Sequence, residues 1–346
     1  MLNKIKNKIE RELPKYLQDV DKSYSLSKIS PLLFNNIKEF ASRKGKRVRP
    51  ILFVYGYLGF AKKPAAGLYK SALSLELLHD FLLIHDDIID KSELRRGKPS
   101  MHNILNVYLK KFKKRKFTGE DLAIIIGDVM YVMALHTLLS IKEDPIRKER
   151  ALKRLIETAI YTGSGEFIEL LFGTKDIQQI GKQDIYKIYD LKTAFYTFAC
   201  PLSMGAILAG ANQKQSDMLF QYGAYLGRAF QIKDDIIGMF GQETKIGKST
   251  LTDLQEAKKT LLVWFAYHNS DKKAKSAIKR IFSKDKVNKA DLEAMRKIII
   301  KSGALDYAKK EVDELIKKAR EILRYCVMRP KFKDALDNYS KNLLSL

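Results

Sequence analysis

The chain has 346 residues, of which 46% are hydrophobic and 30% charged, and 64 Lys and Arg against 40 Asp and Glu give it a formal net charge of +24. This balance excludes a disordered polypeptide, and its two cysteines, Cys200 and Cys326, exclude a disulfide framework and favour a reducing cytosol. So large a positive excess indicates an anionic partner, which is nucleic acid, an anionic membrane surface or a phosphorylated substrate.

Apolar residues recur at intervals of three and four, a spacing that predicts helix after helix. The pattern occurs in nearly every segment, and the predicted helices include Pro50 to Phe60, Tyr69 to Asp90, Leu122 to Ile141, Ala151 to Phe172, Leu191 to Ala211 and Ser216 to Phe240. No segment has the period-two alternation of a strand, and none of the breaks between helices resembles a flexible linker. We therefore expect a single all-α domain over residues 1–346.

Membrane insertion and secretion are not expected. A membrane helix needs roughly 18 to 20 uncharged apolar residues, and the best candidate, Asp121 to Ile141, contains Asp128 and His136. The segment Met1 to Val20 lacks the apolar core of a signal peptide. The protein is expected to stay in the cytosol.

Two predicted helices end in paired aspartates. The first reads FLLIHDDIID and carries Asp86, Asp87 and Asp90, and the second reads AFQIKDDIIG and carries Asp234 and Asp235. Asp86 and Asp90 are four residues apart and share one helix face. Because carboxylates at the end of an apolar helix are unfavourable without a cation, and because oxygen ligands without cysteine suit Mg²⁺, we expect a magnesium site.

Basic residues alternate with these acidic clusters along the chain. Lys46, Arg47 and Arg49 precede Pro50 at a predicted helix start, where anions are favoured. Further basic residues follow the aspartates at Arg95, Arg96, Lys248, Lys258 and Lys259. The alternation predicts metal-bridged binding of polyanionic phosphates, with Arg supplying bidentate contacts.

Six motifs in order resemble those of the trans-isoprenyl diphosphate synthases. They are GKRVRP at Gly45 to Pro50, HDDIID at His85 to Asp90, LRRGKPSMH at Leu94 to His102, KT at Lys192 and Thr193, FQIKDD at Phe230 to Asp235, and GK at Gly247 and Lys248. The resemblance covers about residues 45–260 strongly, and the order of six motifs is more specific than any one of them.

The resemblance implies a homodimeric helical bundle of the isoprenoid synthase type, with a central cavity. Its two aspartate motifs would hold three Mg²⁺ against an allylic diphosphate, with Asp86, Asp90 and Asp234 as ligands. The implied catalytic set is Asp86, Asp87, Asp90, Asp234, Asp235, Lys192 and Thr193. Thr193 would shield the developing cation. The allylic diphosphate would be held by Arg95, Lys192, Gln231, Lys248 and Lys258, and isopentenyl diphosphate by Lys46, Arg49, His79 and Arg96.

The chain departs from the family pattern at three positions. Gly238 stands where a third aspartate of the second motif is common, and Lys44 and Ala257 stand where glycine is common. The missing aspartate makes tight binding of the third Mg²⁺ doubtful.

Other features admit ordinary structural roles. His85 is interpreted as a structural residue, and Asp128 and Trp264 as packing or interface residues. The basic run Lys110 to Lys116 is interpreted as a solvated loop, with attachment to anionic membranes as a second hypothesis.

Four other classes of protein fit the sequence less well. A metal-dependent phosphohydrolase would need more imidazoles than the five histidines present. A P-loop enzyme is disfavoured because the spacing in 241–249 is one residue too long. A basic nucleic-acid- or membrane-binding protein would leave the aspartates without a role. A terpene cyclase would not need a second diphosphate pocket.

Residues before the first aspartates predict the product length. Phe81 lies five residues before Asp86, and Leu82 four, so an aromatic occurs at the fifth position but not at the fourth. This pattern resembles geranylgeranyl diphosphate synthases of the archaeal type, and we expect a C20 product, with farnesyl (C15) or longer (C25) products as alternatives.

Overall fold

A computed structural model describes residues 1–241 and 251–344. Almost all regular structure in these ranges is helical, which confirms the all-α prediction. The helices are α1 (Leu2–Tyr24), α2 (Leu26–Ile29), α3 (Pro31–Ala41), α4 (Val48–Phe60), α5 (Leu68–Ser71), α6 (Leu73–Ile89), α7 (Met101–Leu109), α8 (Gly119–Leu138), α9 (Pro145–Thr174), η1 (Ile177–Gln179), α10 (Lys182–Ile188), η2 (Tyr189–Ala199), α11 (Cys200–Leu208), α12 (Gln213–Phe240), α14 (Thr252–Gln255), α15 (Leu261–His268), α16 (Lys272–Phe282), α17 (Lys289–Lys301), α18 (Ala304–Tyr325) and α19 (Pro330–Leu344).

The centre of the molecule is formed where α4 crosses α11. Every residue of α11 is buried, as are the residues of α4 from Pro50 to Gly59. Two glycines permit the close crossing, because a Cβ on Gly56 would lie 2.2 Å from the Leu202 carbonyl oxygen and one on Gly205 would lie 2.1 Å from the Phe53 carbonyl oxygen. No larger residue fits either position without displacing a backbone.

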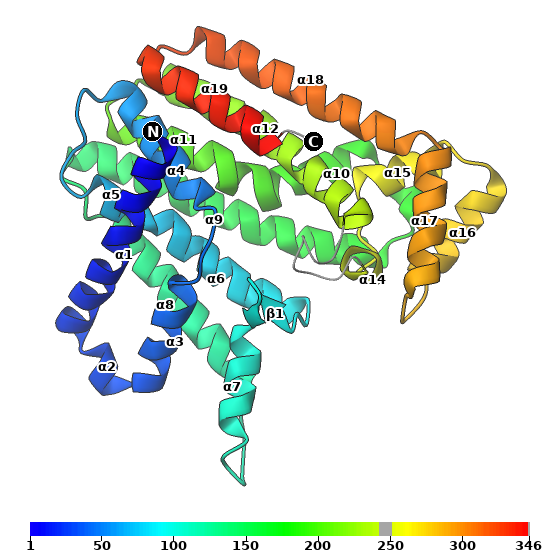
Figure 1. The fold of residues 1–346 in the computed structure, drawn as a ribbon, viewed down its shortest axis with the longest axis horizontal. Helices are drawn as coiled ribbons and strands as arrows, with labels where there is room; N and C mark the ends of the chain where they lie inside the picture. Colours follow the sequence, from blue (N-terminus) through cyan, green and yellow to red (C-terminus); the bar gives the residue numbers. More distant parts are fainter. Residues whose placement is uncertain (242–250, 345–346) are drawn as a thin grey trace.

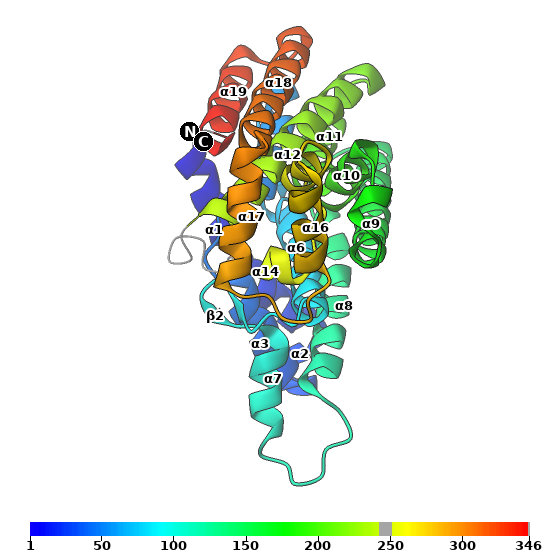
Figure 2. The same cartoon turned by 90° about the vertical axis from the view of Figure 1, so that its right-hand side faces the viewer.

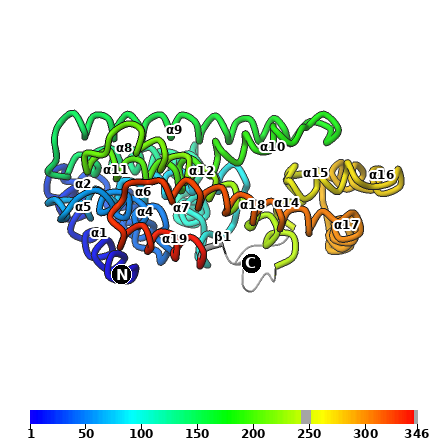
Figure 3. The backbone as a smooth tube through the Cα atoms, turned by 90° about the horizontal axis from the view of Figure 1, so that it is seen from above, coloured from blue at the N-terminus to red at the C-terminus, as the bar shows by residue number. Residues whose placement is uncertain are grey.

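The other long helices are arranged around this centre. Helix α12 packs between η2 and α18, and α6 packs against α8. Seen from above in Figure 3, α9 runs along one side of the molecule and α18 and α19 along the other. Helices α15, α16 and α17 gather at one end, and the loop after α7 projects from the bundle (Figures 1 and 2). This arrangement brings the C-terminal end of α6 opposite η2.

The predicted helices and breaks are largely confirmed, with three differences. The segment predicted as Tyr69 to Asp90 is two helices, α5 and α6. The segment predicted to begin at Leu191 is a continuous run from α10 through η2, a π-helix, into α11. A short antiparallel hairpin also occurs, made of β1 (Leu94–Arg95) and β2 (Lys98–Pro99). Such a hairpin is too short to give an alternating pattern.

Among the described residues, two helical stretches, Gly119–Leu138 and Lys182–Leu208, are long and apolar enough to cross a membrane by length and composition. The sequence analysis expected no such stretch, because it required an apolar run without charged residues, whereas these stretches contain a few. In the most apolar 18-residue window of the second stretch, 72% is buried inside the protein, so packing accounts for its composition. Cys200 and Cys326 are free and buried, as expected of packing residues. Trp264 is also a packing residue, since its Nε1 donates to the Ile180 carbonyl oxygen at 3.0 Å.

Candidate active site

The first aspartate cluster lies at the C-terminal end of α6. Asp86 is partly exposed, whereas Asp87 is fully buried and accepts a 2.7 Å hydrogen bond from Arg95 Nε. Asp90 caps the helix, and burial, together with the neighbouring Asp86 carboxylate, raises its pKa to about 7. A cation placed beside Asp86 and Asp90 would relieve this repulsion. Asp87 instead holds Arg95.

A tight hairpin positions the two arginines. Arg96 and Gly97 form the turn between β1 and β2, with φ of 55° and 74°, the left-handed pair that a two-residue hairpin turn requires. Arg95 reaches Asp87 and Asp86, and Arg96 reaches Glu76 and Asp80, both at 3.4 Å. Arg95 therefore contacts the first aspartate cluster, whereas its neighbour Arg96 contacts the acidic residues Glu76 and Asp80 farther back on α6.

The second aspartate cluster lies on α12. Asp234 is exposed, whereas Asp235 is buried, accepts hydrogen bonds from Tyr189 and from Gln231 Nε2 (2.9 Å), and has its pKa raised by burial to about 8. Gln231 in turn accepts a 2.6 Å hydrogen bond from Thr193. This chain of contacts joins α12 to η2, so that Lys192 and Thr193 are held beside the aspartates.

Lys192 connects the first aspartate cluster with α9. Its ammonium lies 3.8 Å from Asp86 Oδ1 and 2.7 Å from Glu166 Oε2, and it also pairs with Glu169. Although burial acts most strongly and lowers it, the pKa of Lys192 is raised on balance by Glu169, Asp86 and Glu166, so the amine stays charged. The sequence analysis missed Glu166 and Glu169. Their signal was two carboxylates three residues apart in the otherwise apolar GEFIEL segment.

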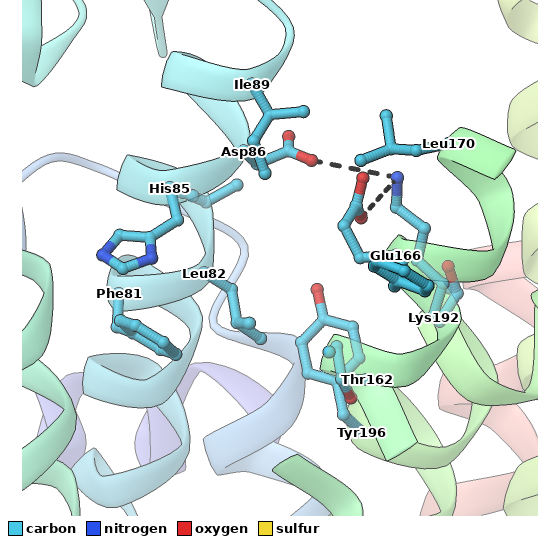
Figure 4. A pocket seen from close by; sticks show the side chains of 14 residues that line it. Phe81, Leu82, His85, Asp86, Ile89, Thr162, Glu166, Leu170, Lys192 and Tyr196 are labelled. Carbon is cyan, nitrogen blue, oxygen red and sulfur yellow. Dashed lines mark ion pairs between the residues drawn. The ribbon is translucent and has the colours of Figure 1, made fainter. Parts of the chain in front are cut away.

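A cavity of about 390 Å³ opens between α6 on one side and α9 and η2 on the other. Figure 4 shows its polar end, where Asp86 faces Lys192 and Glu166. Toward the other end the lining becomes apolar. Phe81 and Leu82 line it there, opposite Thr162 and Tyr196 (Figure 4). A cavity with a charged end and an apolar end suits a molecule with an anionic head and a hydrocarbon tail.

The structure assigns packing partners to Phe81, the residue predicted to limit chain length. Its ring lies 4.6 Å from the His85 ring and 5.2 Å from the Tyr131 ring, between centroids. His85 also lies 3.7 Å from Asp128, and both Tyr131 and Asp128 belong to α8. Phe81 thus lines the cavity on the side nearest α8, and His85, interpreted from the sequence as structural, lines the same cavity.

A second cationic pocket lies beside the first. Arg49 donates to Tyr196 Oη (2.5 Å) and Thr197 Oγ1 (2.9 Å), and Tyr196 Oη also lies 3.4 Å from His79 Nδ1. Burial, reinforced by Arg49, lowers the pKa of His79 well below its ordinary value, so the imidazole is neutral. Within the described part of the chain, Arg49 Nε and Arg96 Nη1 are buried without hydrogen-bond partners. Such orphaned donors fit an anionic ligand.

The remaining predicted site residues differ in how they are placed. Lys46 is exposed at the start of α4. Lys258 pairs with Asp253 (3.3 Å) and Glu256 (2.8 Å), and Lys248 lies outside the described residues. Ala257 has φ of 50°, which explains why glycine is common there: a side chain at this angle costs about 1–2 kcal/mol.

The acidic groups fit Mg²⁺ held jointly with a substrate. Within residues 1–241 and 251–344, no three His, Cys, Asp or Glu side chains lie close enough to hold an ion by themselves. Mg²⁺ commonly takes one or two carboxylates and completes its octahedron with water and phosphate oxygens. The partly exposed Asp86 and the exposed Asp234 are of this open kind.

Comparison with known proteins agrees with this geometry. Residues 30–299 match the family model of the polyprenyl synthetases. The chain is 34% identical to the geranylfarnesyl diphosphate synthase of Aeropyrum pernix, over 87% of this chain and 88% of the relative, and 32% identical to the geranylgeranyl diphosphate synthase of Saccharolobus solfataricus, over 80% of each.

A solved structure shares the fold. A geranylgeranyl pyrophosphate synthase from Corynebacterium glutamicum, determined with isoprenyl diphosphate and magnesium, superposes with a TM-score of 0.89 over 100% of this chain and 99% of that one. At 24% identity this likeness shows the fold alone.

Proposed function

The chain belongs to the polyprenyl synthetase family and is an isoprenyl diphosphate synthase. We propose that it condenses isopentenyl diphosphate with allylic diphosphates to a C20 product, geranylgeranyl diphosphate. The observation that carries the proposal is the cavity between α6 and α9, which has paired carboxylates and Lys192 at one end and Phe81 and Leu82 farther along it.

Binding of the two substrates follows from the two cationic pockets. The allylic diphosphate would lie between the aspartate clusters, held by Arg95, Lys192 and Lys258, and its hydrocarbon tail would enter the apolar part of the cavity. Isopentenyl diphosphate would be held by the orphaned donors of Arg49 and Arg96. Asp86, Asp90 and Asp234 would hold Mg²⁺, and three ions remain the number that we predict.

The chemistry requires the allylic C–O bond to break. Asp86, Asp90 and Asp234 would hold Mg²⁺, which when bound would supply charge neutralisation for the departing diphosphate. Lys192 and Arg95 would add fixed positive charge at the same end. Thr193, which lines the cavity and donates to Gln231, would shield the allylic cation. The double bond of isopentenyl diphosphate then attacks the cation, and the released diphosphate can take the proton that is lost.

Product length depends on the apolar part of the cavity. Phe81 is about 7.5 Å along the helix axis from Asp86, at roughly 1.5 Å per residue. Thr162, Gly163 and Tyr196 face α6 from the other side. Some relatives are named geranylgeranyl diphosphate synthases and others geranylfarnesyl diphosphate synthases. The C25 product, geranylfarnesyl diphosphate, is therefore the second candidate. The test is chromatography of dephosphorylated products made from labelled isopentenyl diphosphate and C5, C10 or C15 starters. A final product shorter or longer than C20 would refute the C20 assignment, and a C25 product would favour the second candidate.

We also propose that the enzyme is a homodimer joined through α8 and α9. Three exposed apolar residues are spaced seven residues apart: Ile125 and Val132 of α8, and Leu139 at its C-cap. Ile160 and Phe167 of α9 repeat this spacing and are more than 60% exposed. Stripes of period seven are typical of helices that pack against helices, and exposed apolar patches of this kind mark interfaces.

The basic loop between α7 and α8 supports peripheral membrane attachment of a cytosolic enzyme. Residues 110–118 are exposed, and Phe112 and Phe117 stand among the lysines with 49% and 67% exposure. Cations near an anionic membrane contribute about 1 kcal/mol each. We propose that this loop brings the enzyme to membranes that receive its hydrophobic product. Absence of sedimentation with anionic vesicles at low ionic strength would refute this role, and no nucleic-acid partner is proposed.

A further inference from the structure

The second aspartate motif has no side chain at its last position. In the first motif Asp90 follows Asp86 by four residues, and in the second Gly238 follows Asp234 by the same interval. Residues four apart on a helix lie one above the other. Position 238 is therefore where α12 would present the partner carboxylate of Asp234.

A carboxylate from another element fills this place. A Cβ on Gly238 would lie 2.5 Å from Asp253 Oδ2, closer than real Cβ contacts allow. Asp253 belongs to α14, and its other oxygen, Oδ1, pairs with Lys258 at 3.3 Å. The carboxylate thus lies against the bare backbone of α12, in space that a Cβ at position 238 would take.

Contacts on both sides hold α14 in this position. Gln255 Nε2 donates to the Asp285 carbonyl oxygen at 2.7 Å, and Lys259 Nζ donates to the Gly173 carbonyl oxygen at the end of α9, also at 2.7 Å. The Lys258 backbone N–H donates to the Asp253 carbonyl oxygen at 3.0 Å. Asp253 is therefore placed by an anchored turn.

We propose that Asp253 supplies the third carboxylate of the second aspartate cluster, in the space left by Gly238, and helps Asp234 to hold Mg²⁺ with the diphosphate. The inference rests on the proposed function, since it concerns the same metal–diphosphate site. The second motif lacks its usual third aspartate. With Asp253 in that role, three carboxylates, Asp234, Asp235 and Asp253, still lie at this end of α12.

The test measures binding of inorganic diphosphate by calorimetry, with and without Mg²⁺, and does not require turnover. Asp253→Asn removes a negative charge, so without Mg²⁺ it should bind the anion as well as or better than the original protein. With Mg²⁺ it should bind about tenfold more weakly, a loss of about 1.4 kcal/mol. The double variant G238D/D253A moves the carboxylate onto α12 and should recover most of the Mg²⁺ effect.

Two glycine variants form a matched pair. Gly238→Ala should displace the Asp253 carboxylate and weaken Mg²⁺-dependent binding, whereas Gly173→Ala should not, because its Cβ would make only an ordinary 3.8 Å contact with the Glu256 carbonyl oxygen. Unchanged Mg²⁺-dependent binding in D253N would overturn the proposal. So would a loss that G238D/D253A fails to recover while circular dichroism shows it folded, because Asp253 would then act through Lys258 alone.

Failure of the proposed function is a separate result. It would appear as an original protein that makes no prenyl product from any starter, whatever the binding data for the variants show.

Discussion

Truncation of Phe81 tests how the cavity limits product length. The ring contacts His85 and Tyr131 and lines the cavity beside Leu82. A Phe→Ala change at a fully buried site lowers the free energy of unfolding by about 3–5 kcal/mol. The loss for Phe81→Ala should be smaller because its ring is only half-buried. Since folded domains have about 5–15 kcal/mol of stability, the variant should remain folded.

The space vacated by the ring is available to the product. One more isoprene unit adds five carbons, and at about 0.8 kcal/mol for each buried carbon up to about 4 kcal/mol would favour the longer tail. We therefore expect products of C25 and longer from Phe81→Ala, measured by chromatography after dephosphorylation. Phe265→Ala serves as the control, because Phe265 is also half-buried but stacks on Tyr307 in α18. A folded Phe81→Ala enzyme with an unchanged product would refute the reasoning.

Three further predictions concern catalysis, stability and assembly. Asp86→Ala should lower turnover more than about a thousandfold, a loss of about 4 kcal/mol of transition-state stabilisation. The control Asp19→Ala, which loses only a surface pair with Lys70, should leave turnover unchanged. An active Asp86→Ala enzyme would contradict the metal assignment. Burial, and after it the charge of Glu76, raises the pKa of Asp80 from 3.8 to about 8 in the folded protein. The folded protein therefore loses stability as the pH rises from the unfolded-chain pKa of Asp80 toward 8, and Asp80→Asn should melt at a higher temperature by a margin that grows from pH 5 to 8. A margin that stays constant with pH would count against this prediction. Val132→Glu on the exposed stripe of α8 should give monomers by light scattering while Ile29→Glu, at an exposed site on α2, should not; a dimeric Val132→Glu protein would place the interface elsewhere.

The sequence predicted the helical elements well because their signals are local. The spacing of apolar residues marks each buried helix face, and the four-residue interval between Asp86 and Asp90 places both on one side of α6. The sequence also shows that Arg95 follows the first aspartates by a few residues, although it assigned Arg95 to the diphosphate and did not predict its pairing with Asp87. These features need no knowledge of how the helices pack.

What the sequence could not predict depends on contacts between distant elements. Glu166 and Glu169 join the site only because α9 packs against η2. Gly163 and Tyr196 face Phe81 and Leu82 for the same reason. The absence of an aspartate at position 238 predicted a weakened metal site, and only the packing of α14 against α12 brings Asp253 to that position.

The most direct test of the central claim is the stoichiometry of one condensation. The purified protein would be given C15 allylic diphosphate, labelled isopentenyl diphosphate and Mg²⁺, and both the C20 product and free diphosphate would be measured over time. The account predicts one diphosphate released for each isopentenyl unit incorporated, and neither product when the chelator EDTA removes Mg²⁺ or when the allylic substrate is omitted. Diphosphate release without carbon–carbon bond formation, or incorporation that persists in EDTA, would contradict it.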